Sequence, residues 1–119
     1  MYRHTPVGPG YDVDDSLVLA RDLVRAGVDL LDLSPSSIDA PGDRAVPFAG
    51  LGVPLIAVNE LDQVDRALEV LREGRADLVA VGRALIADPD WASKVRAGRF
   101  DDIVECVYCD ECHTNLDAG

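Results

Sequence analysis

The pair Gly82-Arg83 is the first of two places in the chain where residue types and spacing suit a chemical task. It directly follows residues 78–81, a short apolar run whose composition is typical of a strand buried on both faces. A glycine at the carboxyl end of such a strand lets a phosphate approach backbone N–H groups, and an arginine adds a charged, forked donor. The pair therefore indicates a phosphate site, and the alternative is an ordinary tight turn.

Three cysteines form the second group, because two residues separate Cys106 from Cys109 and two more separate Cys109 from Cys112. Closely spaced thiolates are the ligands that iron–sulfur clusters and zinc require. An odd number of cysteines near the end of the chain does not predict a disulfide framework. The alternatives are a metal site, with His113 as a further candidate ligand for zinc, and three free thiols.

Strand–helix units supply the elements that position these residues. The predicted strands lie near residues 28–34, 53–58 and 77–82, and the predicted helices near residues 12–26, 61–73 and 88–97. Such alternation with short connections predicts an α/β fold with parallel strands. Ligands of these folds bind beyond the carboxyl ends of the strands, where Ser34, Asn59 and Gly82-Arg83 all fall.

The helices carry start and stop signals. Asp12 and Asp88 are predicted N-caps, and Asp88 is followed by a proline, which suits the first position of a helix. Gly27 and Gly74 are predicted to end the first two helices. In the second helix the residues predicted to face inward are Leu61, Val64, Leu68 and Leu71.

Length and charge limit the possible fold and partners. The chain has 119 residues, which is room for one domain, whereas a complete (β/α)8 barrel needs about 250 residues. A net charge of −11, from 11 Lys and Arg against 22 Asp and Glu, argues against nucleic acid or an anionic membrane as a partner. The apolar run 53–58 is too short to span a bilayer, and no signal sequence opens the chain, so we expect a cytoplasmic protein.

Residues 76–99, ADLVAVGRALIADPDWASKVRAGR, closely resemble the last barrel strand and following helix of the Old Yellow Enzyme-like NADH:flavin (FMN) oxidoreductases. A weaker likeness extends from about Tyr2 to Cys112. The resemblance implies a partial (β/α)8 TIM barrel of about the last three βα units. Residues 1–104 would form this C-terminal part of the barrel, and residues 105–119 a cysteine-rich tail.

The resemblance also implies cofactors and the residues that bind them. In the family, FMN is the cofactor, NAD(P)H is the hydride donor, and the Gly-Arg pair that matches Gly82-Arg83 holds the FMN phosphate. Arg3 matches an arginine beside the N1 and O2 edge of the flavin. Asn59 takes the place of a glycine that meets the phosphate, and its side chain would crowd that group.

Some larger members of the family hold a 4Fe–4S cluster just after this barrel helix. Their usual spacing is two and then three residues between cysteines, with a fourth cysteine further on. Cys106, Cys109 and Cys112 depart from this pattern, and no fourth cysteine follows them. A 4Fe–4S cluster is therefore one of several interpretations of the tail that stay open.

Catalysis in the family depends on a substrate-anchoring pair of His/Asn or His/His and on a proton-donating tyrosine, all from earlier strands that this sequence does not contain. We therefore name no catalytic residue. The predicted function is a fragment of an FMN-dependent oxidoreductase, of the NAD(P)H:flavin oxidoreductase or ene-reductase type, that is inactive by itself. The alternatives are a non-catalytic phosphate- or metal-binding module and an inactive remnant. The expected partners are flavin and nicotinamide, with the missing N-terminal half of the barrel or a second copy of the chain.

Overall fold

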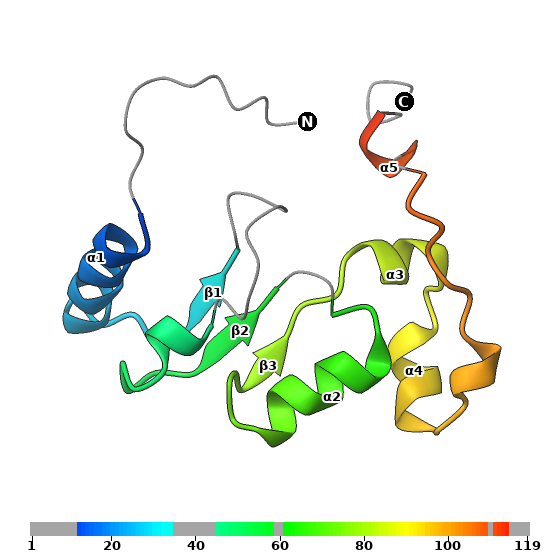
Figure 1. Ribbon diagram of the computed structural model, residues 1–119, viewed down its shortest axis with the longest axis horizontal. Helices are drawn as coiled ribbons and strands as arrows, with labels where there is room; N and C mark the ends of the chain where they lie inside the picture. The colour runs from blue at the N-terminus through cyan, green and yellow to red at the C-terminus, as the bar shows by residue number, and fades with distance from the viewer. Residues whose placement is uncertain (1–11, 35–44, 59–60, 110, 115–119) are drawn as a thin grey trace. The chain divides into compact units, whose positions relative to one another are not determined.

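The computed structural model describes residues 12–34, 45–58, 61–109 and 111–114. The chain divides into two compact units, Arg3–Ala80 and a second that begins at Val81. The first unit contains α1 (Val13–Arg25), β1 (Leu31–Leu33), the 3-10 turn η1 (Val46–Phe48), β2 (Leu55–Ala57), α2 (Val64–Arg72) and β3 (Leu78–Val79), as Figure 1 shows. The second contains α3 (Arg83–Ala87), α4 (Trp91–Arg96), the 3-10 turn η2 (Phe100–Asp102) and α5 (Glu111–Thr114).

The three strands form one parallel sheet in the order β1-β2-β3. This confirms the predicted fold class, although each strand is shorter than the apolar run that predicted it. Asp77 adds two bonds to β2: its backbone N–H donates to the Leu55 carbonyl at 3.0 Å, and its Oδ2 accepts from the Leu55 N–H at 2.9 Å. Because β2 bonds on both sides, it is the central strand of the sheet.

The two faces of the sheet differ in what covers them. Paired residues form three rows, namely Leu31–Leu55, Asp32–Ile56–Leu78 and Leu33–Ala57–Val79. Successive rows point to opposite faces. The first and third rows pack in the core of the unit, whereas the middle row lies on the other face, where Leu78 is 50% exposed. The buried members of this core are Ala20, Leu31, Ala45, Phe48, Leu55, Ala57, Leu61, Ala67, Val70 and Ala76.

Helix α1 begins and ends as the sequence predicts. The Asp12 side chain accepts hydrogen bonds from the N–H groups of Asp14 and Asp15, and the Asp15 side chain accepts one from the Asp12 N–H, which makes a capping box. Gly27 follows the helix at a φ of +98°, a conformation that favours glycine, and Gly74 does the same after α2 at +65°.

Two helix predictions are wrong in detail. Helix α2 begins at Val64 rather than at residue 61, and its buried residues are Ala67 and Val70, while Leu71 is exposed. Ala67 and Val70 belong to the core of the unit, and α2 contacts β3. Helix α4 begins at Trp91 rather than at residue 88, although Asp88 does make cap bonds: its side chain accepts from the Asp90 N–H and its carbonyl from the Trp91 N–H.

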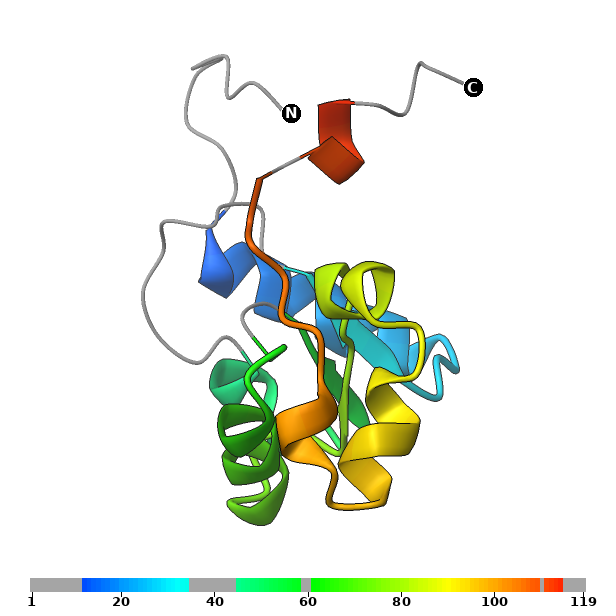
Figure 2. The same ribbon diagram turned by 90° about the vertical axis from the view of Figure 1, so that its right-hand side faces the viewer.

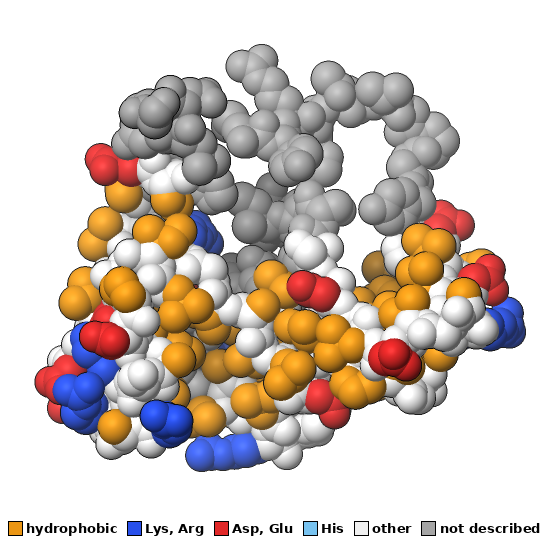
Figure 3. All heavy atoms as spheres, turned by 180° about the vertical axis from the view of Figure 1, so that it is seen from behind, with side chains coloured by type: hydrophobic (Ala, Val, Ile, Leu, Met, Phe, Trp, Pro, Cys, Tyr) orange, Lys and Arg blue, Asp and Glu red, His pale blue; other side chains and the backbone are white. Residues whose placement is uncertain are grey.

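Many large apolar side chains remain on the surface, as Figure 3 shows for the face opposite to that of Figure 1. In the first unit they are Val13, Val18, Leu19, Leu23, Leu30, Val46, Leu71 and Leu78, and in the second Leu85, Ile86, Phe100, Val104, Val107 and Tyr108. Within the described ranges, none of the helices has the length and apolar character needed to cross a membrane.

The assignment of the sheet faces predicts opposite effects at two adjacent residues of β3. Val79→Ser should lower the free energy of unfolding by about 1–2 kcal/mol, because Val79 packs on the core and the new hydroxyl would enter an apolar site. Leu78→Ser should change it by less than about 0.5 kcal/mol, because Leu78 is half exposed. Urea denaturation followed by circular dichroism measures both, and equal losses would mean that the faces are assigned wrongly.

Candidate cofactor site

The carboxyl ends of the three strands lie at one edge of the sheet, because the strands are parallel. Ser34 follows β1 directly and is exposed there. Arg3 and Asn59, the other two residues predicted to contact FMN, lie outside the described residues. Their expected contacts therefore stay predictions, and the geometry of the site rests on Gly82 and Arg83.

Gly82 and Arg83 form the start of the second unit's first helix. Helix α3 begins at Arg83 and is not among the helices predicted from the sequence. The Gly82 carbonyl accepts hydrogen bonds from the N–H groups of Leu85 and Ile86 at 3.0 and 3.3 Å. Gly82 has a φ of −98°, and a Cβ built on it would meet no atom of the described residues within 4 Å apart from its chain neighbours and the backbone of its own helix. Neither backbone conformation nor crowding by the chain therefore requires glycine here.

The Arg83 side chain stacks on an aromatic ring of the same unit. Its guanidinium carbon lies 4.5 Å from the centre of the Tyr108 ring. At this distance a guanidinium over a ring face is attracted by the negative potential of the π system. No pattern in the sequence indicates this contact, because 24 residues lie between the two positions and a tyrosine inside a cysteine group is not a recognised partner for an arginine.

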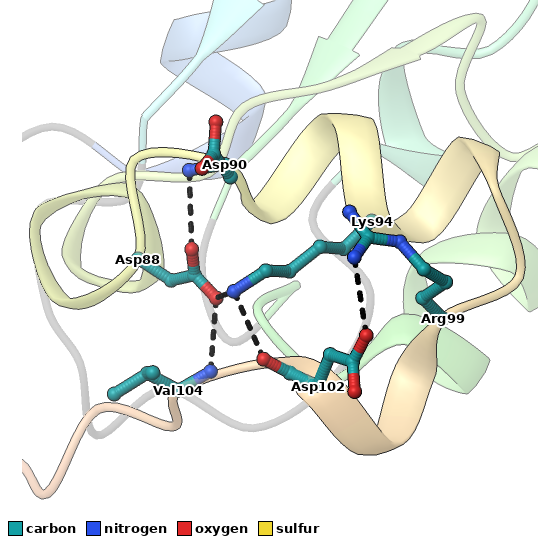
Figure 4. A network of polar contacts seen from close by, with 6 residues as sticks. All are labelled: Asp88, Asp90, Lys94, Arg99, Asp102 and Val104. Carbon is teal, nitrogen blue, oxygen red and sulfur yellow. Dashed lines mark hydrogen bonds and ion pairs between the residues drawn. The ribbon is translucent and has the colours of Figure 1, made fainter.

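Asp88 is the only buried charged residue within the described residues, and its carboxylate joins three segments of the second unit (Figure 4). Its Oδ2 accepts from Lys94 Nζ at 2.7 Å and from the Val104 N–H at 2.9 Å, while Oδ1 accepts from the Asp90 N–H at 3.1 Å. Lys94 Nζ also donates to the Asp102 carbonyl at 2.9 Å. The network therefore holds α3, α4 and the chain after η2 together.

The protonation equilibrium of Asp88 reflects this arrangement. The Lys94 ammonium that bonds to it, and then the Val104 N–H, hold the pKa of the Asp88 carboxyl below its ordinary value, although burial acts in the opposite direction. A buried carboxylate is tolerated here because it is fully hydrogen-bonded and paired. Sequence reasoning missed the pair because Asp88 and Lys94 are six residues apart, which is not a spacing at which helical side chains meet.

The segment after η2 leads from this network to the cysteines, and Figure 2 shows it as one extended stretch between η2 and α5. Cys106, Cys109 and Cys112 are all free thiols, and Cys109 is exposed. The Tyr108 N–H donates to Cys106 Sγ at 3.4 Å, and Tyr108 has a φ of +54°, which is unusual for a residue with a side chain.

The metal site predicted at Cys106, Cys109 and Cys112 stays a prediction. In the part of the chain that the structure describes, no three side chains of His, Cys, Asp or Glu come together to hold a metal ion. A tetrahedral zinc or a 4Fe–4S cluster needs its ligands gathered around one point. We therefore derive no chemistry from a metal at these thiols.

The comparisons with known proteins identify the family. Residues 48–102 match the sequence profile of the NADH:flavin oxidoreductase / NADH oxidase family. A stretch of 59 residues is 44% identical to an NADH oxidase of Thermoanaerobacter brockii and covers 50% of this chain and 9% of that protein. Over 92 residues the chain is 38% identical to an NADPH dehydrogenase of Geobacillus thermodenitrificans, with 69% of this chain and 27% of that protein covered.

The structure is also similar to solved structures. A solved complex of 2-naphthoyl-CoA reductase with 2-naphthoyl-CoA has a TM-score of 0.74 and 29% identity over 86% of this chain and 18% of the other. The chain belongs to the NADH:flavin oxidoreductase / NADH oxidase family, and its fold is part of an Old Yellow Enzyme-like TIM barrel. It spans between 9% and 27% of the length of these three proteins.

The lowered pKa of Asp88 predicts how acid affects the chain. Because the folded state favours the carboxylate, its contribution to stability is complete above the unfolded pKa of about 4 and is lost as the pH falls through the lower folded pKa. The melting temperature of Asp88→Asn should therefore lie below that of the unmodified chain at pH 7, and the difference should shrink below pH 4.

Thermal unfolding followed by circular dichroism from pH 7 to pH 2.5 measures this difference. Asp101→Asn is the matched control, because Asp101 is exposed and the change removes the same charge from the same unit. A constant difference between the unmodified chain and Asp88→Asn across the whole pH range would contradict the prediction.

Proposed function

We propose that this chain supplies the FMN phosphate-binding end of a NAD(P)H:flavin oxidoreductase and acts as part of a complete barrel. The observation that carries the proposal is the position of Gly82-Arg83. The pair follows β3 after two residues, at the carboxyl end of a parallel strand, where ligands of this fold class bind. It also lies within the residues that match the flavin oxidoreductase family.

The open space at Gly82 supports the phosphate role. A glycine that neither a positive φ nor a close neighbour explains is expected where a ligand approaches the backbone. Arg83 supplies planar, charged N–H donors beside it, which suit phosphate oxygens. A non-glycine residue at position 82 would place its Cβ in the space that the phosphate needs.

FMN fits the residues that are present at this end of the fold. The N–H groups of Gly82 and Arg83 and the Arg83 guanidinium would hold the phosphate. Arg3 would lie along the flavin edge and Asn59 near the phosphate, as the family resemblance implies. Bound FMN supplies the hydride transfer itself, with NAD(P)H as the donor, and the protein positions and tunes it.

The proposal assigns catalysis to the complete barrel rather than to this chain. The middle row of the sheet, Asp32, Ile56 and Leu78, faces away from the helix-covered core, which is the direction of the interior in a closed (β/α)8 barrel. A row that is half exposed here would be covered once five further strands close the sheet. Residues 1–104 are the proposed barrel part, residues 105–119 the proposed tail, and the cytoplasm the proposed location.

The phosphate role predicts the effect of two substitutions on FMN affinity. Arg83→Ala should weaken FMN binding by roughly ten- to a hundredfold, because a charge-assisted hydrogen bond contributes about 1.5–3 kcal/mol. Asn59→Gly should strengthen it, because the change removes a side chain from the path of the phosphate. Flavin fluorescence titration of the three proteins measures both effects.

Riboflavin is the matched control ligand, because it has the same ring but no phosphate. Its affinity should be the same in the unmodified chain, Arg83→Ala and Asn59→Gly. Equal affinity of the unmodified chain for FMN and riboflavin would refute the phosphate role. It would favour the alternatives, an inactive remnant or a binding module of another kind.

The open sheet predicts the behaviour of the isolated chain. The outer edges of β1 and β3 have no strand partner in the described sheet, and apolar side chains of α1 are exposed. Unpaired edges and apolar surface favour association. The 119-residue chain should therefore form oligomers, and a monodisperse monomer in ultracentrifugation would contradict this.

A further inference from the structure

We propose that Tyr108 is a positioning residue for Arg83, and that the Cys106 thiol fixes Tyr108 in place. The inference rests on the proposed role of Arg83 at the FMN phosphate and assigns a function to the tail that the cysteine pattern alone does not suggest. The geometry that carries it lies within the second unit, between α3 and the segment after η2.

This segment contacts both ends of α3. Val104 is bonded to Asp88, directly after the last turn of the helix, and Tyr108 stacks on Arg83, its first residue. The five residue steps from Arg83 to Asp88 rise about 7.5 Å in a helix, and the four steps from Val104 to Tyr108 span up to about 14 Å when extended. The segment is therefore long enough to run antiparallel to α3 and to hold it at two points.

The first contact, between Val104 and Asp88, is held by several hydrogen bonds. Asp88 is 3% exposed and bonds to the Val104 N–H and to Lys94, whose ammonium also bonds to the Asp102 carbonyl (Figure 4). The start of the segment is thus fixed by a buried, charge-assisted network. Tyr108 lies only four residues after Val104, so this anchor restricts its position.

The second contact, the stacking of Tyr108 on Arg83, depends on Cys106. The Tyr108 backbone is in the left-handed region at φ +54°, and its N–H donates to Cys106 Sγ at 3.4 Å. A tyrosine seldom adopts this conformation without a local interaction that favours it. The thiol is the acceptor that closes the turn, so it sets the direction in which the ring leaves the backbone.

Stacking of this kind orders a guanidinium without consuming its donors. The N–H groups of arginine lie in the guanidinium plane, whereas the ring attracts one face of that plane. Tyr108 therefore restricts the rotamers of Arg83 through one face of the guanidinium, whereas a phosphate oxygen is bound at its edge. A side chain that is ordered in advance loses less entropy on binding, which raises the affinity for the anion.

The first measurement needs no flavin. In the 119-residue chain, the δ-methylene protons of Arg83 should be shifted upfield by the Tyr108 ring, and the shift should persist in Tyr108→Phe and disappear in Tyr108→Leu. Cys106→Ser, which keeps an acceptor for the Tyr108 N–H, should retain the shift, and Cys106→Ala should reduce it. Arg83 protons that are the same in all five proteins would overturn the inference.

The second measurement is titration of the same proteins with FMN and with riboflavin. Tyr108→Leu should bind FMN about two- to fivefold more weakly, Tyr108→Phe should match the unmodified chain, and riboflavin should show no difference. Unchanged FMN affinity in Tyr108→Leu would overturn the positioning role even if the ring shift is lost. Failure of the unmodified chain to prefer FMN over riboflavin would refute the proposed function, while the Arg83 proton shifts would still decide whether Tyr108 and Cys106 hold the side chain.

Discussion

The parallel pairing of β2 with strands on both sides is the constraint on which the rest of the first unit depends. It brings the three carboxyl ends to one edge, and it fixes which residues of each strand face the helices. Asp77 reinforces it by bonding to both backbone groups of Leu55. A sheet this short gains little from its own hydrogen bonds, so the apolar rows on its covered face supply the stabilisation that holds the strands in register.

In the second unit, the constraint on which the other segments depend is the hydrogen-bonded carboxylate of Asp88. A buried carboxylate is costly unless it is paired and hydrogen-bonded, and this one is bonded to an ammonium and to two backbone N–H groups. The network fixes the chain after η2 relative to α3, and that chain carries Tyr108 to Arg83. The ion pair of Asp88 and Lys94 is therefore connected, through this chain, to the candidate phosphate-binding residue Arg83.

The proposed function separates binding from catalysis. It gives Gly82-Arg83 the task of anchoring a phosphate, which is a local task for one loop and one charged side chain. Hydride transfer additionally requires a substrate pocket built from several strand ends around a barrel. An open face of the sheet with a charged residue, Asp32, beside apolar ones is consistent with a part that is completed by further strands.

The sequence by itself determined the order of the helices and strands as far as β3, the parallel sheet, the caps at Asp12, Gly27 and Gly74, and the family, because these depend on local periodicity and on short motifs. Only the tertiary structure decided the role of Asp88, the inward face of α2 and the contact between Tyr108 and Arg83. Each of these depends on which segments meet, and segments meet through the summed packing of side chains far apart in the chain. A cap motif such as Asp-Pro can be recognised from adjacent residues in the sequence. The lysine and the backbone N–H of Val104 that bind Asp88 approach it only when the chain has folded.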